Sequence, residues 1–336
     1  MSTGLLRRRD LIIFVIGGAA GWPVAAPAQQ AGPMRRLSVL MALSDGDPGG
    51  QVEVDALGAA LRELGWVEGR NIHVDYRWPG GDVERARASA KAAVALKPDV
   101  LLARSTPAAL ALKAETRTIP IVFVSVAEPS SSGLVDGLAR PGGNITGFTN
   151  FESSIGGKLL ELLKEVSPSL KRVAIIYNPD TAPYAPSYLR SVEAGGAALS
   201  IELRPSPVRS DTEIETVLTA IAREPDGGLL AIPDSFLQQR RDLILKLVGR
   251  HRLPAIYATR VWARDGGLMT YAVDTLDLMR RGAGYVDRIL KGASAGDLPV
   301  QQPNKYELVI NLKTARAQGL QASDKLLALA DEVIER

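Results

Sequence analysis

The sequence predicts an α/β protein made of two units of similar size, each with a parallel sheet. Strand-like apolar runs alternate with helical patterns almost from one end of the chain to the other. The chain has 336 residues, which is too long for one ordinary core and favours about two domains. A turn-rich cluster at Pro141–Asn144 interrupts the alternation near its middle, where we expect the units to join.

The first unit contains an uninterrupted apolar run at 119–126, which is typical of a parallel strand buried on both faces. Leu134 and Val135 resume the apolar pattern after one acid, one proline, three serines and a glycine. Such an abrupt polar insertion after a buried strand marks a place where open α/β sheets bind ligands. The expected strands of this unit are 37–43, 71–77, 99–103 and 119–126, with helices at 52–64, 83–96, 108–113 and 133–138.

The second unit repeats the rhythm, and the remainder of the chain is too small for a third domain. Its expected strands are 172–177, 200–203, 228–232 and 255–257, with helices at 154–166, 188–198, 212–223 and 236–250. Strands at 267–271 and 306–311 and helices at 276–290 and 325–334 then complete both units, which requires several crossings of the chain. We therefore expect lobe 1 at 35–145 plus about 263–298, and lobe 2 at 150–260 plus about 300–336.

The first 28 residues have the pattern of a secretory signal peptide. Arg7–Arg9 precede an apolar run, and the segment ends in small residues at Ala26–Ala28. Arg8 and Arg9 resemble the arginine pair of a twin-arginine signal. Export by the general secretory route is the alternative. We expect cleavage near Ala28 and a periplasmic mature protein. An uncleaved N-terminal anchor is the alternative, but this apolar run is short for a membrane helix.

Composition argues against nucleic acid, metal and catalytic chemistry. The net charge is +3, and without residues 1–28 it falls to +1 because three arginines and one aspartate leave with them. No dense Lys/Arg tract with interleaved aromatic residues remains, so nucleic acid is not an expected partner. The chain has no cysteine, and His73 and His251 lie outside any metal-ligand spacing. We expect no cofactor, no metal and no catalytic residue.

Polar residues cluster instead where several expected strands end. Ser105 and Thr106 follow one strand, Ser125 and Glu128 end another, and Asp234 follows a third. These residue types are also common helix N-caps, because their side chains accept hydrogen bonds from free backbone N–H groups. These residues are therefore interpreted either as helix caps alone or as ligand contacts.

Three long stretches of the sequence resemble those of a known protein family. They are PIVFVSVAEPSSSGLVDGLARPGGNITGFT (120–149), RHRLPAIYATRVWARDGGLMTYAVD (250–274) and GYVDRILKGASAGDLPVQQPNKYELVINLKTARAQGL (284–320). Together they resemble the ABC-transporter substrate-binding proteins of the TrpX-like family, over essentially the whole mature chain. The resemblance implies a type I periplasmic-binding-protein fold, in which two Rossmann-like lobes with parallel sheets are joined by a multi-segment hinge.

The same resemblance implies a function without chemistry. It predicts a monomeric receptor that captures a small molecule, an amino acid or an aromatic or carboxylate-type ligand, and delivers it to the permease of an ABC importer. A periplasmic sensor presented to a membrane signalling partner is one alternative, and an α/β enzyme is another. We expect the hinge near Pro141–Thr149, Thr259–Gly266 and Pro299–Pro303, which are rich in turn residues.

The predicted ligand site combines donors, acceptors and aromatic faces. Ser105, Thr106 and the backbone around Ser125 and Val126 would donate to a carboxylate, since helix N-termini favour anions. Asp234, or failing that Glu128, would accept from an ammonium group, and tyrosine rings would form a wall. The candidate residues are Ser44, Ser105, Thr106, Ser125, Val126, Glu128, Asn178, Asp234, Tyr257, Tyr271 and Asp274.

Overall fold

A computed structural model of the chain describes Met1 and residues 33–152 and 155–335. The expected signal peptide, residues 1–28, lies outside this description except for Met1, so its cleavage stays a prediction. From Pro33 onward the chain forms one unit that contains two sheets. The expectation of an α/β fold with parallel sheets in two lobes is confirmed.

The sheet of the first lobe has five parallel strands in the order β2-β1-β3-β4-β5. They are β1 (Arg35–Leu40), β2 (Ile72–Arg77), β3 (Val100–Ala103), β4 (Ile121–Val126) and β5 (Ile145–Thr149). The sequence analysis missed β5, because its short run with threonine and glycine follows the turn cluster and lacks a long apolar pattern. It is the edge strand beside β4.

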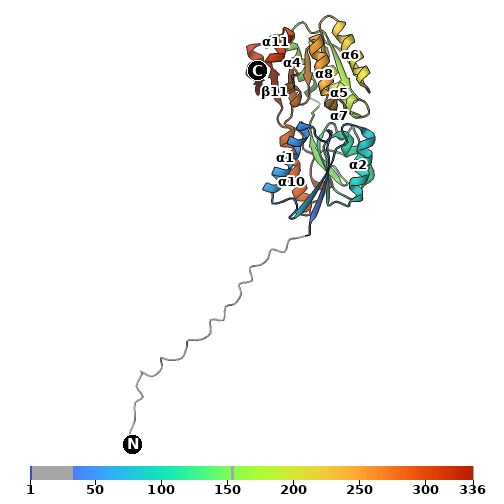
Figure 1. Cartoon of the computed structure of the whole chain (residues 1–336), viewed down its shortest axis with the longest axis vertical. Coiled ribbons are helices and arrows are strands. Elements are labelled where there is room, and N and C mark those ends of the chain that lie inside the picture. The colour runs from blue at the N-terminus through green and yellow to red at the C-terminus, as the bar shows by residue number, and fades with distance from the viewer. Residues whose placement is uncertain (2–32, 153–154, 336) are drawn as a thin grey trace. The chain divides into compact units, whose positions relative to one another are not determined.

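Helices cover both faces of this sheet, which explains the continuous apolar run of β4. Val122 and Val124 pack with α1 (Pro48–Glu63) and α10 (Thr275–Leu290). Ile121 and Phe123 pack on the other face with α2 (Val83–Ala95) and α3 (Thr106–Glu115). A short 3-10 turn, Ala295–Asp297, follows α10. Figure 1 shows α1, α2 and α10 gathered around this sheet.

The sheet of the second lobe has seven strands in the order β12-β11-β10-β9-β8-β6-β7, and only the β10–β11 pair among them is antiparallel. The strands are β6 (Arg172–Tyr177), β7 (Glu202–Pro207), β8 (Gly227–Ala231), β9 (Ala255–Tyr257), β10 (Met269–Ala272), β11 (Glu307–Asn311) and β12 (Glu332–Ile334). The helices are α4 (Ile155–Val166), α5 (Ala185–Leu199), α6 (Asp211–Arg223), α7 (Ser235–Gln239), α8 (Arg241–His251), α9 (Val261–Arg264), α11 (Leu312–Gln318) and α12 (Asp324–Leu329). One face packs against α4 and α5 and the other against α6 and α8 (Figure 1).

The pairing of β10 corrects one expected lobe boundary. We placed residues from about 263 onward in the first lobe, but β10 hydrogen-bonds to β9 and β11 in the second sheet. The chain returns to the first lobe only between β10 and α10. The expected C-terminal helix at 325–334 is also too long, because α12 ends at Leu329 and Glu332–Ile334 pair with β11.

The chain crosses between the lobes after β5, between β10 and α10, and before β11. Two of the expected hinge segments were wrong: Pro141–Thr149 includes β5 of the first sheet, and Thr259–Gly266 includes α9 of the second lobe. Pro299–Pro303 does lie at a crossing. There the backbone of Gln301 donates to Gly147 and accepts from Thr149, both at 2.9 Å, so this segment and β5 lie side by side.

Candidate ligand-binding site

A cavity between the two lobes collects the ends of several strands from both sheets. Its empty volume, which includes space open to solvent, is about 440 Å³. The first lobe contributes Leu43, Arg104, Ser105, Thr106 and Ser125. The second lobe contributes Thr181, Tyr184, Asp234, Ser235, Gln238 and Thr259, with Asn150 at a crossing. We call this space the central cavity.

Ser125 is held in an unusual conformation at the edge of the central cavity. Its φ of 57° lies in the left-handed region, which non-glycine residues seldom adopt, and the β4–β5 register shifts between Val124 and Val126. Ser125 is only 4% exposed and lines the central cavity, and its Oγ has no hydrogen-bond partner among the residues that the structure describes. Buried hydroxyl groups are normally satisfied, so this hydroxyl is free to pair with a bound molecule.

The start of α3 supplies two further polar residues, one of which caps the helix. Ser105 Oγ accepts a hydrogen bond of 3.3 Å from the backbone N–H of Ala108, which is an N-cap contact. Thr106 is 4% exposed and lines the central cavity, and its hydroxyl makes no side-chain hydrogen bond to the residues that the structure describes. The capping alternative therefore holds for Ser105, while the Thr106 hydroxyl is available to a bound molecule.

Asp234 joins the start of α7 to the loop after β6 and also lines the central cavity. Its carboxylate accepts hydrogen bonds from the backbone N–H groups of Asn178 at 2.6 Å and Phe236 at 2.8 Å, and from the Thr181 hydroxyl. Burial raises the pKa of Asp234 to about 6, and these hydrogen bonds oppose the rise. The hydrogen bond from Phe236 caps α7, so Asp234 is both a helix cap and an acidic residue in the lining of the central cavity.

Arg104 brings a buried cation whose charge is balanced within the first lobe. Its Nε and Nη2 atoms donate to the two carboxylate oxygens of Glu53 at 2.9 and 2.6 Å, in the two-pronged geometry that fixes a guanidinium plane. Arg104 also borders a second cavity with an empty volume of about 970 Å³, which lies beside α1 and α9. Arg104 therefore borders both cavities, and Glu53 borders the second.

Four predicted residues lie near the central cavity without lining it. Ser44 Oγ donates to Gln239 Oε1 of the second lobe at 2.8 Å. Val126 is completely buried, and the backbone oxygen of Glu128 accepts from Ser131 and Ser132 within a turn. Asn178 is buried and borders a different groove. The serines after β4 thus close a turn rather than face the cavity.

The two predicted tyrosines belong to packing instead of the site. Tyr257 is 1% exposed and stacks on Trp262 with ring centroids 4.6 Å apart. Tyr271 stacks on Tyr306 with centroids 5.5 Å apart. Neither residue lines the central cavity.

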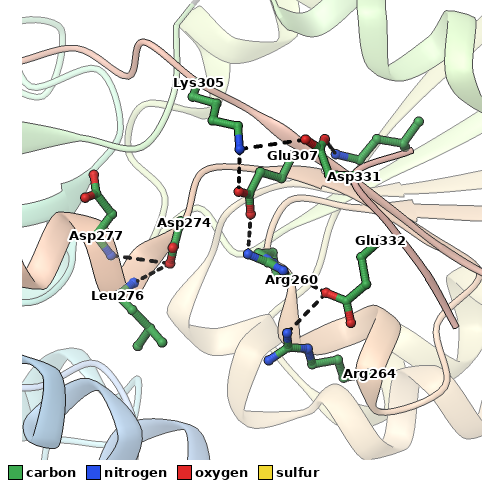
Figure 2. Close-up of polar contacts among 10 residues, drawn as sticks. Arg260, Arg264, Asp274, Leu276, Asp277, Lys305, Glu307, Asp331 and Glu332 are labelled. Carbon is green, nitrogen blue, oxygen red and sulfur yellow. Dashed lines mark hydrogen bonds and ion pairs between the residues drawn. The ribbon is translucent and has the colours of Figure 1, made fainter. Parts of the chain in front are cut away.

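Asp274 also lies away from the central cavity. Figure 2 shows its carboxylate accepting from the backbone of Leu276, at 2.8 Å, and of Asp277, at the start of α10. Beside it, Arg260 joins Glu307 and Glu332 in a network that ties α9 to the last two strands (Figure 2). Asp274 is therefore a helix cap at a lobe crossing.

Several cavity residues escaped the sequence analysis. Thr259 comes two residues after the end of β9, so the strand-end rule could have found it in place of Tyr257. Asn150 follows β5, which was not recognised as a strand. Gln238 lies on α7, a helix of five residues that the sequence pattern merged with α8. Thr181 and Tyr184 belong to a loop from which we selected only Asn178.

Comparison with known proteins identifies the family. The model of the ABC transporter substrate binding protein family matches residues 39–334. The chain belongs to this family. Its members are binding proteins rather than enzymes, and they act outside the cytoplasm, so the interpretation as an α/β enzyme is set aside.

Known relatives agree with this assignment. A tyrosine-binding protein of Clostridioides difficile (strain R20291) is 27% identical over 263 residues, which cover 78% of this chain and 75% of the relative. A conserved domain protein of Vibrio cholerae O1 biovar El Tor has a similar structure, with a TM-score of 0.83 and 28% identity over 89% of this chain and 99% of the other.

An ABC domain from Streptococcus pneumonia, solved in complex with L-Trp, is similar at a TM-score of 0.82, 23% identity, and coverage of 90% and 100%. At this identity the likeness concerns the fold, and it supports the type I periplasmic-binding-protein architecture.

Two further observations apply to the part of the chain that the structure covers. Within residues 33–152 and 155–335, no group of histidine, aspartate and glutamate side chains is arranged to hold a metal ion. In the same ranges, none of the helices combines the length and the apolar character needed to cross a bilayer.

Proposed function

We propose that this protein is the periplasmic receptor of an ABC importer and that it closes its two lobes around an amino acid with an aromatic side chain. Family membership supports the general role, and the tyrosine-binding relative supports the ligand class. The single observation that carries the site is Ser125, which lines the central cavity with a left-handed backbone and a buried hydroxyl that has no partner among the described residues.

The polar groups of the central cavity match the two charges of an amino acid. Ser125 and Thr106 offer hydroxyl donors beside the N-terminus of α3, where the helix adds positive potential for a carboxylate. Asp234 on the facing lobe offers negative charge for the ammonium group. Since the two sets lie on different lobes, one ligand that contacts both would favour the closed arrangement.

A thermal-shift screen of the mature protein tests the ligand class. L-tyrosine, L-tryptophan and L-phenylalanine form the test set, with L-leucine, L-glutamate and 4-hydroxyphenylacetate as comparisons. A ligand at a hundred times its Kd adds about 2.7 kcal/mol to the free energy of unfolding. A shift with aromatic amino acids and none with 4-hydroxyphenylacetate supports recognition of both charges. No shift with any amino acid contradicts the proposal.

Export and delivery are separate parts of the proposal. Residues 1–28 have the composition of a signal peptide, so the mature protein is expected to begin at Gln29. N-terminal sequencing of protein from the periplasmic fraction checks this, and recovery of Met1 or Ser2 in the membrane fraction would speak for an anchor. Uptake of radiolabelled ligand by cells with and without the gene tests delivery through a permease.

A further inference from the structure

The loop between β2 and α2 contains two neighbouring glycines, and the second of them touches the second lobe. Gly80 and Gly81 have φ values of 61° and 68°, both in the left-handed region that glycine adopts without strain. A Cβ on Gly81 would lie 2.6 Å from the backbone oxygen of Ser235 and 3.0 Å from its carbonyl carbon. These atoms belong to α7, so the backbones of two lobes meet at Gly81 with no room for a side chain.

The contacts that a side chain would make differ between positions 80 and 81. A Cβ on Gly80 would meet Ser44 Oγ, a rotatable side-chain atom of the same lobe. At Gly81 the obstructing atoms are backbone atoms at the start of a helix, which cannot rotate away. A side chain at position 81 therefore requires the lobes to move apart, whereas one at position 80 displaces a hydroxyl group.

A hydrogen bond across the lobes lies beside this contact. Ser44 Oγ donates to Gln239 Oε1 at 2.8 Å, and Gln239 Cγ lies 3.1 Å from the position of a Gly81 Cβ. Ser44, Gly81 and Gln239 do not line the central cavity, whereas Ser235, which Gly81 contacts, does. The lobes thus have a contact surface of their own.

From these contacts we propose that Gly81 is an affinity-determining residue that acts through lobe closure and not through the ligand. The proposal rests on the proposed function, in which the ligand binds between closed lobes. When only the closed form holds the ligand tightly, the apparent Kd is the intrinsic Kd divided by the fraction of closed protein. A substitution that lowers the closed fraction tenfold therefore raises the apparent Kd tenfold.

The variant Gly81→Ala tests this proposal, and Gly69→Ala is its matched control. Gly69 lies in the same lobe with a similar φ of 76°, but a Cβ there would have no neighbour within 4 Å. Both variants carry the backbone strain of alanine at positive φ, and only Gly81→Ala adds the collision with α7. Thermal unfolding without ligand measures the shared strain, and Ser44→Ala removes the lobe-to-lobe hydrogen bond without strain.

Titrations with L-tyrosine distinguish an effect on lobe closure from an effect of backbone strain. Gly81→Ala should raise Kd at least tenfold, mainly through faster dissociation, and Ser44→Ala should raise it less. Gly69→Ala should bind as the parent does. Equal Kd values for Gly81→Ala and Gly69→Ala would overturn the proposal, as would an unchanged Kd in both Gly81→Ala and Ser44→Ala.

Fluorescence energy transfer reads lobe closure without relying on the ligand. The chain has no cysteine, so Lys91→Cys in α2 and Lys246→Cys in α8, both exposed, take dyes at those sites alone. The closed fraction should fall in Gly81→Ala and stay at the parent value in Gly69→Ala. If the parent fails to bind any amino acid, the proposed function is rejected, while this measurement still supports or overturns the role of Gly81.

Discussion

At the scale of single residues, the neighbours Ser105 and Thr106 have roles that mutations can separate. Ser105 caps α3 through its bond to Ala108, whereas the Thr106 hydroxyl has no side-chain partner among the described residues and borders the central cavity. A cap and a ligand contact lose different quantities when the hydroxyl is removed. The pair therefore gives an internal comparison at one helix end.

We predict that Thr106→Ala weakens binding of L-tyrosine by tenfold to over a hundredfold. A hydrogen bond to a charged group is worth about 1.5–3 kcal/mol, and this difference acts on Kd. Ser105→Ala should instead lower the free energy of unfolding by about 1 kcal/mol through loss of the cap. Calorimetric titration and denaturant unfolding of both variants provide the check. Binding within twofold of the parent for Thr106→Ala would remove this residue from the site.

The raised pKa of Asp234 predicts how binding depends on pH. Burial lifts this pKa to about 6, so the ligand-free carboxyl group becomes neutral as the pH falls below that value. A neutral Asp234 attracts an ammonium group less, so the affinity for L-tyrosine should fall between pH 7 and pH 5. Asp234→Asn should bind more weakly at pH 7 and lose this pH dependence. A parent affinity that is constant over the range would argue against the ammonium contact.

The same pKa predicts an opposite trend for stability without ligand. Between the ordinary value of 3.8 and about 6, the folded protein holds a proton on Asp234 that the unfolded chain has released. This contribution to the free energy of unfolding is present below pH 3.8 and is lost as the pH rises through about 6. The difference in stability between the parent and Asp234→Asn should follow that curve in urea unfolding at several pH values.

At the scale of elements, α10 begins directly after the chain crosses into the first lobe. Asp274 caps it through Leu276 and Asp277, and the helix then packs against α1 and β4. We predict that Asp274→Ala lowers the free energy of unfolding by about 1 kcal/mol and leaves Kd for L-tyrosine within twofold of the parent. A loss of affinity without a loss of stability would return Asp274 to the list of ligand contacts.

At the scale of the whole molecule, three crossings join the lobes and a cavity lies between them. Crossing segments of this kind can absorb rotation while each sheet stays rigid. We predict that L-tyrosine at saturation lowers the radius of gyration in small-angle scattering. Gly81→Ala should remain more extended than Gly69→Ala under the same conditions. Identical profiles with and without bound ligand would indicate a rigid module.

The sequence predicted those cavity-lining residues whose position follows from where a strand ends. Ser105, Thr106 and Asp234 were found this way, because carboxyl ends of parallel strands meet at one edge of a sheet. The rule failed where a strand was not recognised, as with Asn150 after β5. It also failed at Tyr257, the last residue of β9, whose ring packs against Trp262 and does not line the central cavity.

The sequence by itself determined the two α/β lobes and their sheets, since buried parallel strands and amphipathic helices need particular apolar periods. It also determined the family through long matching stretches. Tertiary structure alone decided the left-handed backbone of Ser125, the transfer of β10 to the second sheet, and the contact of Gly81 with α7. These features depend on backbone angles and on which distant segments meet, and local residue patterns carry no information about either.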